Sequence, residues 1–211
     1  MRRHQRGFTL IELMVVIAII GLLAYFLLPN LIGAAKEREN TETKARIQHL
    51  VAIAEQWNRK HGFFPPDNFV GGADFPQKPK VDLVNAGIES FVFFTHLKKE
   101  GMQTLEGKDA WYANTDEDDA GVPITLLGTT KKIEIVDVWG TPLAYFNAST
   151  DNYTKAQRIR TADGAETSAR PLKNPLTGAF LAPRQYQILS AGRDREFGTD
   201  DDLSFPEPPK Q

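Results

Sequence analysis

The feature that most constrains this chain is an apolar run from Phe8 to Leu28, in which Glu12 is the only charged side chain. At ~1.5 Å per residue, a helix of this length covers roughly 30 Å, about the hydrocarbon thickness of a bilayer. Arg2, Arg3 and Arg6 lie immediately before the run and favour keeping the N-terminus in the cytoplasm. The sequence therefore predicts a transmembrane helix over residues 8–28, with the following chain exported.

Glu12 needs an explanation, because a carboxylate within a membrane span is costly and usually has a function. It lies only about one helical turn beyond Phe8, however, so a position at the membrane interface accounts for it equally well. Both interpretations stay open on the residues alone. Pro29 follows the run without an A-x-A pattern, so cleavage of a secretory signal at this end is not expected.

Residues 7–13, Gly-Phe-Thr-Leu-Ile-Glu-Leu, and the proline after the run resemble the class III signal of type IV pilins and of type II secretion pseudopilins. The major pseudopilin of type II secretion is the most similar of these. The resemblance implies that residues 1–7 are a leader, which a prepilin peptidase cuts off between Gly7 and Phe8 before methylating the amine of Phe8. It also implies that Glu12 is an assembly residue, which pairs with a neighbouring subunit's terminal amine, and that Pro29 kinks the helix.

Apolar residues continue beyond Pro29 at three- and four-residue spacing as far as Trp57, with charged residues between them. This spacing predicts an amphipathic continuation of the helix over residues 29–62. Gly62 and Pro65 provide the stop signals. The apolar stripe needs a partner, so we expect an α+β, pilin-like fold. In it a long N-terminal α-helix, with a membrane-spanning first half and an amphipathic second half, packs on a small antiparallel β-sheet.

One periplasmic globular domain is expected over residues 63–205, followed by a proline-rich tail over residues 206–211. Apolar spacing predicts a helix over roughly 85–100. Residues 67–132 otherwise give little pattern. The acidic run at 116–119 is interpreted as a solvated loop, with a cation site as the alternative.

Alternation over residues 132–136 predicts a strand, and Asp137-x-Trp139-Gly140-x-Pro142 predicts a turn followed by an aromatic strand. This turn resembles the sheet region of the type II major pseudopilins. We expect Trp139 to close the core between helix and sheet. Residues 147–178 are polar, and we expect an extended loop there.

A second strand is expected at 186–190, before a loop dense in glycine and aspartate. Such loops suit calcium, which takes about six to eight oxygens from carboxylates and backbone carbonyls; a solvated acidic loop is the alternative. Ser-x-Gly-x-Asp and the later Gly-Thr-x-Asp-Asp resemble the calcium loop of the major pseudopilin. The resemblance implies a calcium site within residues 190–204, with these candidate ligands: Asp194, Asp200, Asp201, Asp202 and the carbonyl of Ala191.

No catalytic pattern is found: the chain has no cysteine, and its four histidines are scattered. We expect no enzyme activity. A formal net charge of −2, without a basic stripe, also gives no reason to expect nucleic-acid binding.

The resemblance implies a structural subunit of a periplasmic filament in a type II protein secretion system. Such a subunit is a single-pass protein of the bacterial inner membrane, with its N-terminus cytoplasmic before processing and its C-terminal domain periplasmic. The implied partners are further copies of the chain, the prepilin peptidase, minor pseudopilins and the inner-membrane assembly platform. Two alternatives stay open: a pilin or minor pilin of a type IV pilus, and a membrane-anchored calcium-binding module that never polymerises.

Overall fold

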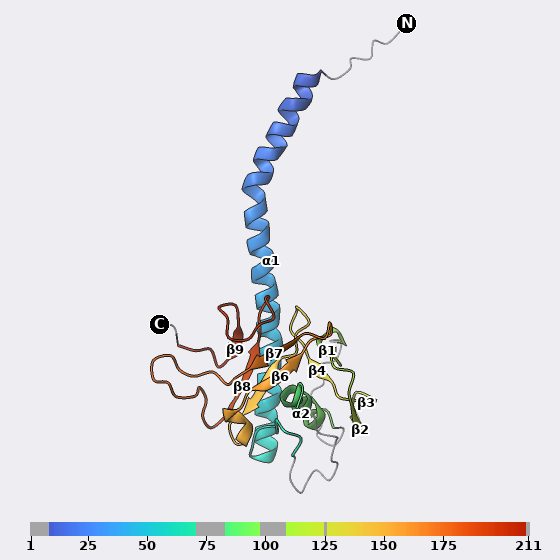
Figure 1. The fold of residues 1–211 in the computed structure, drawn as a ribbon, viewed down its shortest axis with the longest axis vertical. Helices are drawn as coiled ribbons and strands as arrows, with labels where there is room; N and C mark the ends of the chain where they lie inside the picture. The colour runs from blue at the N-terminus through green and yellow to red at the C-terminus, as the bar shows by residue number, and fades with distance from the viewer. Residues whose placement is uncertain (1–8, 71–82, 98–108, 125, 210–211) are drawn as a thin grey trace. The chain divides into compact units, whose positions relative to one another are not determined.

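The computed structural model describes residues 9–70, 83–97, 109–124 and 126–209 (Figure 1). Side chains are described in these ranges except at residues 27–32, 109, 123 and 124. The chain forms two compact units, one reaching to Thr41 and one beginning at Glu42. One helix, α1 (Leu10–His61), runs through the boundary between them.

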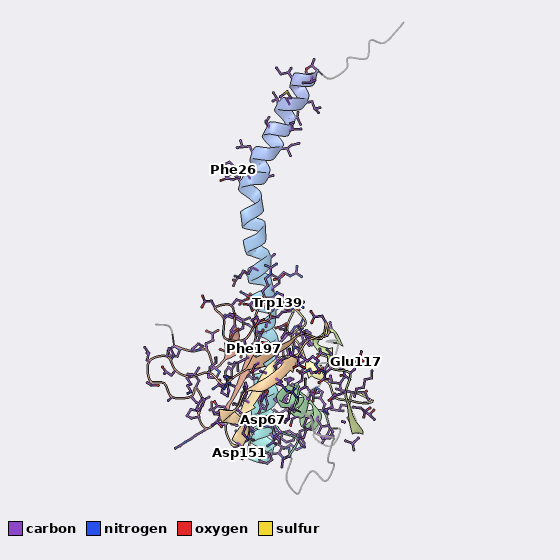
Figure 2. The ribbon with its side chains drawn as sticks, viewed as in Figure 1. Phe26, Asp67, Glu117, Trp139, Asp151 and Phe197 are labelled. Carbon is purple, nitrogen blue, oxygen red and sulfur yellow. The ribbon has the colours of Figure 1, made fainter. Side chains whose placement is uncertain are left out.

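The first unit is built on the N-terminal part of α1. Its large apolar side chains from Leu10 to Phe26 are 45 to 77% exposed, and Phe26 projects outward from the helix (Figure 2). The backbone stays helical through Pro29. The kink at Pro29 stays a prediction.

Among the residues that the structure describes, no helix is long and apolar enough to cross a membrane. The predicted span covers residues 8–28, but Phe8 and the side chains of Leu27 and Leu28 lie outside the described part of the chain. The membrane span therefore stays a prediction.

In the second unit, the C-terminal part of α1 buries one stripe of side chains, which confirms the predicted amphipathic continuation. The helix ends where expected. Gly62 has a φ of +79°, a region that suits glycine, and its N–H donates to the carbonyl of Asn58 at 2.8 Å. The buried members of the stripe are Ile47, Leu50, Ile53, Ala54 and Trp57. The first four pack with residues of α2 (Ala86–Thr95) and of the strands in one core, and Trp57 packs in a second core with Phe93 and Phe94 of α2.

Within the described residues, the named strands pair antiparallel, and one isolated parallel bridge joins Val84 to Arg158. The largest sheet has the order β5-β8-β9, with Tyr145 opposite Ile188 and Ile188 opposite Phe205. Three two-stranded sheets accompany it, β1-β4, β2-β3 and β6-β7. The bounds are β1 (Tyr112–Ala113), β2 (Asp119–Ile124), β3 (Thr129–Lys131), β4 (Glu134–Ile135), β5 (Ala144–Asn147), β6 (Gln157–Arg160), β7 (Glu166–Ala169), β8 (Tyr186–Ser190) and β9 (Leu203–Phe205), with short 3-10 helices η2 (Asp109–Trp111) and η3 (Asp151–Thr154).

Two expectations about this unit are wrong. Residues 147–178 are not one extended loop, because β6 and β7 form a hairpin within them, in which Ile159 pairs with Thr167. In this hairpin only Gln157, Ile159 and Ala169 are buried. So short an alternation among polar residues does not predict a strand from sequence. Trp139 does not close the core; it is only partly buried, whereas Trp57 is fully buried.

Candidate functional site

The N-terminus of α1 carries a capping box formed by Thr9 and Glu12. The Thr9 N–H and hydroxyl donate to Glu12 Oε2 at 2.8 and 2.7 Å, and the Glu12 N–H donates to Thr9 Oγ1 at 3.3 Å. This reciprocal arrangement satisfies N–H groups that a helix end leaves without partners. Sequence reasoning missed the role of Thr9, although Thr-x-x-Glu before an apolar run is its signature. Gly7 and Phe8 lie outside the described residues, so cleavage and methylation stay predictions.

The C-terminal acidic loop is organised around Asp201. Its Oδ2 accepts hydrogen bonds from the N–H groups of Arg193 at 2.7 Å and Asp194 at 3.2 Å, and its Oδ1 accepts from the Thr199 hydroxyl at 2.8 Å. Burial acts to raise the pKa of Asp201, but these hydrogen bonds outweigh it and hold the pKa below its ordinary value. The carboxylate is therefore kept ionised within the loop.

Asp202 lies in the same group of carboxylates. Its Oδ2 accepts from the Gly198 N–H at 2.7 Å. Burial raises the pKa of Asp202, and the negative charges of Asp194 and Asp201 raise it further, which places the three side chains near one another. Asp194, Asp201 and Asp202 thus lie in one loop, but their carboxylate oxygens are not all within 4.8 Å of one another. Asp200 is exposed. Its neighbours Asp201 and Asp202 are the aspartates of this triplet whose carboxylates accept the backbone hydrogen bonds described above.

A second acidic cluster lies inside the second unit; sequence analysis kept a cation site in residues 116–119 as an alternative but missed Glu89 and Glu134. Glu89 on α2, Asp116 in the loop between β1 and β2, and Glu134 on β4 each bring a carboxylate oxygen within 4.8 Å of the other two. Within the described residues, this is the one group of three such side chains close enough to share a metal ion. The solvated-loop interpretation of residues 116–119 is correct for Glu117, which is exposed at the margin of the unit (Figure 2). It is wrong for Asp116, which is partly buried.

Hydrogen bonds fix one member of this cluster firmly. Glu134 Oε1 accepts from the side-chain amide of Asn85 at 2.9 Å and from the Thr115 N–H at 3.2 Å, and its Oε2 accepts from the same N–H at 3.1 Å. Burial still raises the pKa of Glu134 to about 8. Burial and, next, the charge of Asp118 raise the pKa of Glu89 to about 10.

Comparisons with known proteins identify the family. The prokaryotic N-terminal methylation motif matches residues 2–25. The type IV wide pilus major component PilA4 of Thermus thermophilus is 46% identical over 119 residues, which cover 54% of this chain and 85% of that protein. This chain belongs to the type IV pilin-like family.

Other relatives of this pilin-like chain are components of secretion systems. The type II secretion system core protein G of Dickeya chrysanthemi is 45% identical over 56 residues, covering 26% of this chain and 35% of that protein. The core protein G of Escherichia coli is 38% identical over 64 residues, covering 30% and 44%. The pilin-like chain thus spans less than half of these two relatives. No solved structure matches it.

Proposed function

We propose that the chain is a pseudopilin, a non-enzymatic structural subunit of a periplasmic filament in a type II secretion system. One observation supports this most: the methylation motif stands at the start of a 52-residue helix whose apolar side chains from Leu10 to Phe26 are exposed. So large an apolar surface has to be covered by lipid or by other proteins. Before assembly, we propose, residues 8–28 lie in the inner membrane; in the filament, the helices of other subunits replace the lipid.

The capping box suggests how assembly is controlled. In the single chain, the Glu12 carboxylate accepts both Thr9 donors. After cleavage before Phe8, a neighbouring subunit's methylated amine would offer this carboxylate a positive charge. Opposite charges attract strongly where water is excluded, and an unpaired charge there is costly. Glu12 would therefore favour the single axial register in which each amine meets a carboxylate.

Glu12→Ala tests this role, with Glu37→Ala as the matched control, because Glu37 is another exposed carboxylate on the same helix. We expect both variants to reach the membrane fraction and to lose the leader. Glu12→Ala should show no crosslinked ladder of subunits, whereas Glu37→Ala should give the normal ladder. A normal ladder from Glu12→Ala would refute the assembly role. Retention of residues 1–7 in the unaltered chain, with no ladder, would refute the filament itself.

A type IV pilus subunit is the second candidate. The Thermus pilus component aligns over 119 residues, against 56 and 64 for the two secretion proteins. Loss of the gene separates the candidates. Enzymes retained inside piliated cells would support secretion, and bald cells with normal enzyme release would support the pilus.

We further propose that the loop at residues 190–204 binds calcium through Asp194, Asp201 and Asp202. The Asp201 carboxylate accepts a hydrogen bond from the Asp194 N–H at 3.2 Å, and the Asp201 carbonyl approaches Gly192 so closely that a Cβ there would lie 2.5 Å from it. Calcium would supply the positive charge that offsets the mutual repulsion of the three carboxylates. In the full chain in detergent micelles, calcium should raise the unfolding midpoint, and Asp201→Asn should reduce the rise. An unchanged midpoint in the unaltered chain would remove the site and leave the filament proposal intact.

A further inference from the structure

The interior acidic cluster combines three segments that are distant in the chain. Glu89 lies in the first turn of α2, Asp116 follows β1, and Glu134 lies on β4. Glu89 and Glu134 are fully buried, and Asp116 is partly exposed. The group therefore has two rigid members on regular elements and a third on the solvent side, through which an ion could enter.

Glu89 is the member whose environment demands a further partner. Its side chain is fully buried, yet neither carboxylate oxygen has a hydrogen-bond partner in the described part of the chain. Among the described residues, Lys132 forms an ionic contact with it, with Nζ 3.5 Å from Oε2. Burial of a polar group without hydrogen bonds is unfavourable, and more so when the group is ionised. By contrast, Glu134 beside it is held by Asn85 and Thr115.

Lys132 is shared between two acidic side chains. It forms an ion pair with Asp118 and a longer contact with Glu89. A buried carboxylate is stable in its charged form only when it is paired and hydrogen-bonded. In the described part of the chain, Glu89 has this longer contact and no hydrogen bond. A divalent cation would supply the close partner that Glu89 lacks.

We propose that Glu89, Asp116 and Glu134 bind one hard divalent cation of the size of calcium. Two ligands on opposite sides of a calcium ion lie about 4.8 Å apart, since each bond is about 2.4 Å. The three carboxylate oxygens lie within that limit of one another. Calcium, being larger, accepts irregular arrangements of carboxylate oxygens, whereas magnesium demands near-ideal octahedral geometry and usually keeps several waters, so three side chains fixed on separate elements suit calcium better. The ion would connect α2 to the loop after β1 and to β4, and it is separate from the C-terminal loop.

Calcium titration of the full chain in detergent micelles tests the proposal, with Asp201→Asn introduced to silence the C-terminal loop. After removal of metal by a chelator, isothermal titration with calcium alone should show one equivalent bound. Glu89→Gln or Asp116→Asn, added separately, should weaken this binding at least about tenfold. Glu117→Gln is the matched control, because it removes an exposed carboxylate from the same segment; it should leave binding unchanged.

Two variants are used because Glu89→Gln alters a buried residue and can fail to fold. Asp116→Asn then carries the test, since Asp116 is partly exposed and its substitution leaves Glu89 unchanged. Absence of calcium binding in the Asp201→Asn chain would overturn the proposal. So would binding that survives Asp116→Asn and a folded Glu89→Gln unchanged. Tighter binding of magnesium alone than of calcium alone would contradict the size argument.

Discussion

The Ser190 hydroxyl donates a 2.7 Å hydrogen bond to Asp137 Oδ2 and so ties the end of β8 to the turn before β5. The other oxygen, Oδ1, accepts from the N–H groups of Trp139 at 3.0 Å and Thr141 at 2.9 Å. Ser190 Oγ in turn accepts from the Gly192 N–H at 3.2 Å. One buried carboxylate therefore organises both the Asp-x-Trp-Gly-x-Pro turn and the start of the C-terminal acidic loop.

Removing this hydroxyl should be costly. We expect Ser190→Ala to lower the free energy of unfolding by about 1–3 kcal/mol, because Asp137 Oδ2 stays buried without its donor. Chemical denaturation of the full chain in detergent micelles measures the change. Ser168→Ala, an exposed strand serine on β7, is the control and should change stability by less than about 0.5 kcal/mol. Equal effects of the two substitutions would contradict the argument.

Gly87 is required where α2 packs against β5. A Cβ at this position would lie 2.2 Å from the Tyr145 carbonyl oxygen and 2.5 Å from Gln157 Oε1. Gln157 Nε2 already donates to that carbonyl at 2.8 Å, so the site has no room. Gly87→Ala should destabilise the second unit by about 1–3 kcal/mol.

Gly33→Ala is its matched control, because Gly33 also lies in a helix but a Cβ there meets nothing within 4 Å. Alanine favours helix over glycine, so this substitution should be neutral or stabilising. Thermal unfolding of both variants measures the contrast. A Gly87→Ala chain that unfolds at the unaltered midpoint would show that α2 shifts to make room.

The C-terminal loop allows a similar comparison between two glycines. Gly192 has a φ of +69°, and a Cβ there would lie 2.5 Å from the Asp201 carbonyl oxygen, whereas Gly198 has a φ of +93° with open space around it. Both alanine variants are strained in their backbone. Only Gly192→Ala should also displace Asp201. Limited proteolysis should therefore cut the loop faster in Gly192→Ala, and similar rates would contradict the close approach.

His96 gives the second unit a pH-dependent contribution to stability. Its ring is buried between the Thr95 hydroxyl, 2.9 Å from Nδ1, and the Tyr112 hydroxyl, 2.8 Å from Nε2. Burial lowers the pKa of His96 from 6.5 to about 4. The unfolded chain therefore takes up a proton first as pH falls. The contribution is full above pH 6.5 and is lost toward pH 4, by about 3 kcal/mol in total.

The difference in unfolding free energy between the unaltered chain and His96→Gln isolates this contribution, because the other titrating groups are common to both. It should shrink as pH falls through this window. Substitution of the exposed His49 by glutamine is the control, because it removes a histidine from the surface instead of from the core. A difference for His96→Gln that is independent of pH would refute the assignment.

Features that depend on neighbouring residues in the chain, such as helix ends and helical spacing, were predicted correctly from the sequence. Gly62 ends α1 as expected, and spacing identified α2, although the helix is shorter than residues 85–100. In the C-terminal loop that the motif indicated, the Asp194 N–H donates to the Asp201 carboxylate at 3.2 Å, and calcium binding there stays a prediction. Trp139 was misplaced because a turn motif does not specify which aromatic side chain fills the core.

The interior cluster could not be predicted, because it depends on how separate segments pack. Glu89 occupies a helix that otherwise shows apolar spacing, and Glu134 alternates like any strand residue. Asp116 belongs to an acidic run whose ordinary interpretation is a solvated loop. Only the packing of α2 beside β4 brings the three side chains together.

The two parts of α1 differ in where their side chains find partners. From Ile47 to Trp57 the apolar stripe is buried in the core of the second unit, whereas from Leu10 to Phe26 the large apolar side chains are exposed among the residues that the structure describes. In a filament, a harmful substitution between Leu10 and Phe26 would disturb contacts with neighbouring subunits. A harmful substitution between Ile47 and Trp57 would disturb the packing of its own subunit alone. Defects in the first part should therefore behave as genetically dominant when both forms are co-expressed, and defects in the second as recessive.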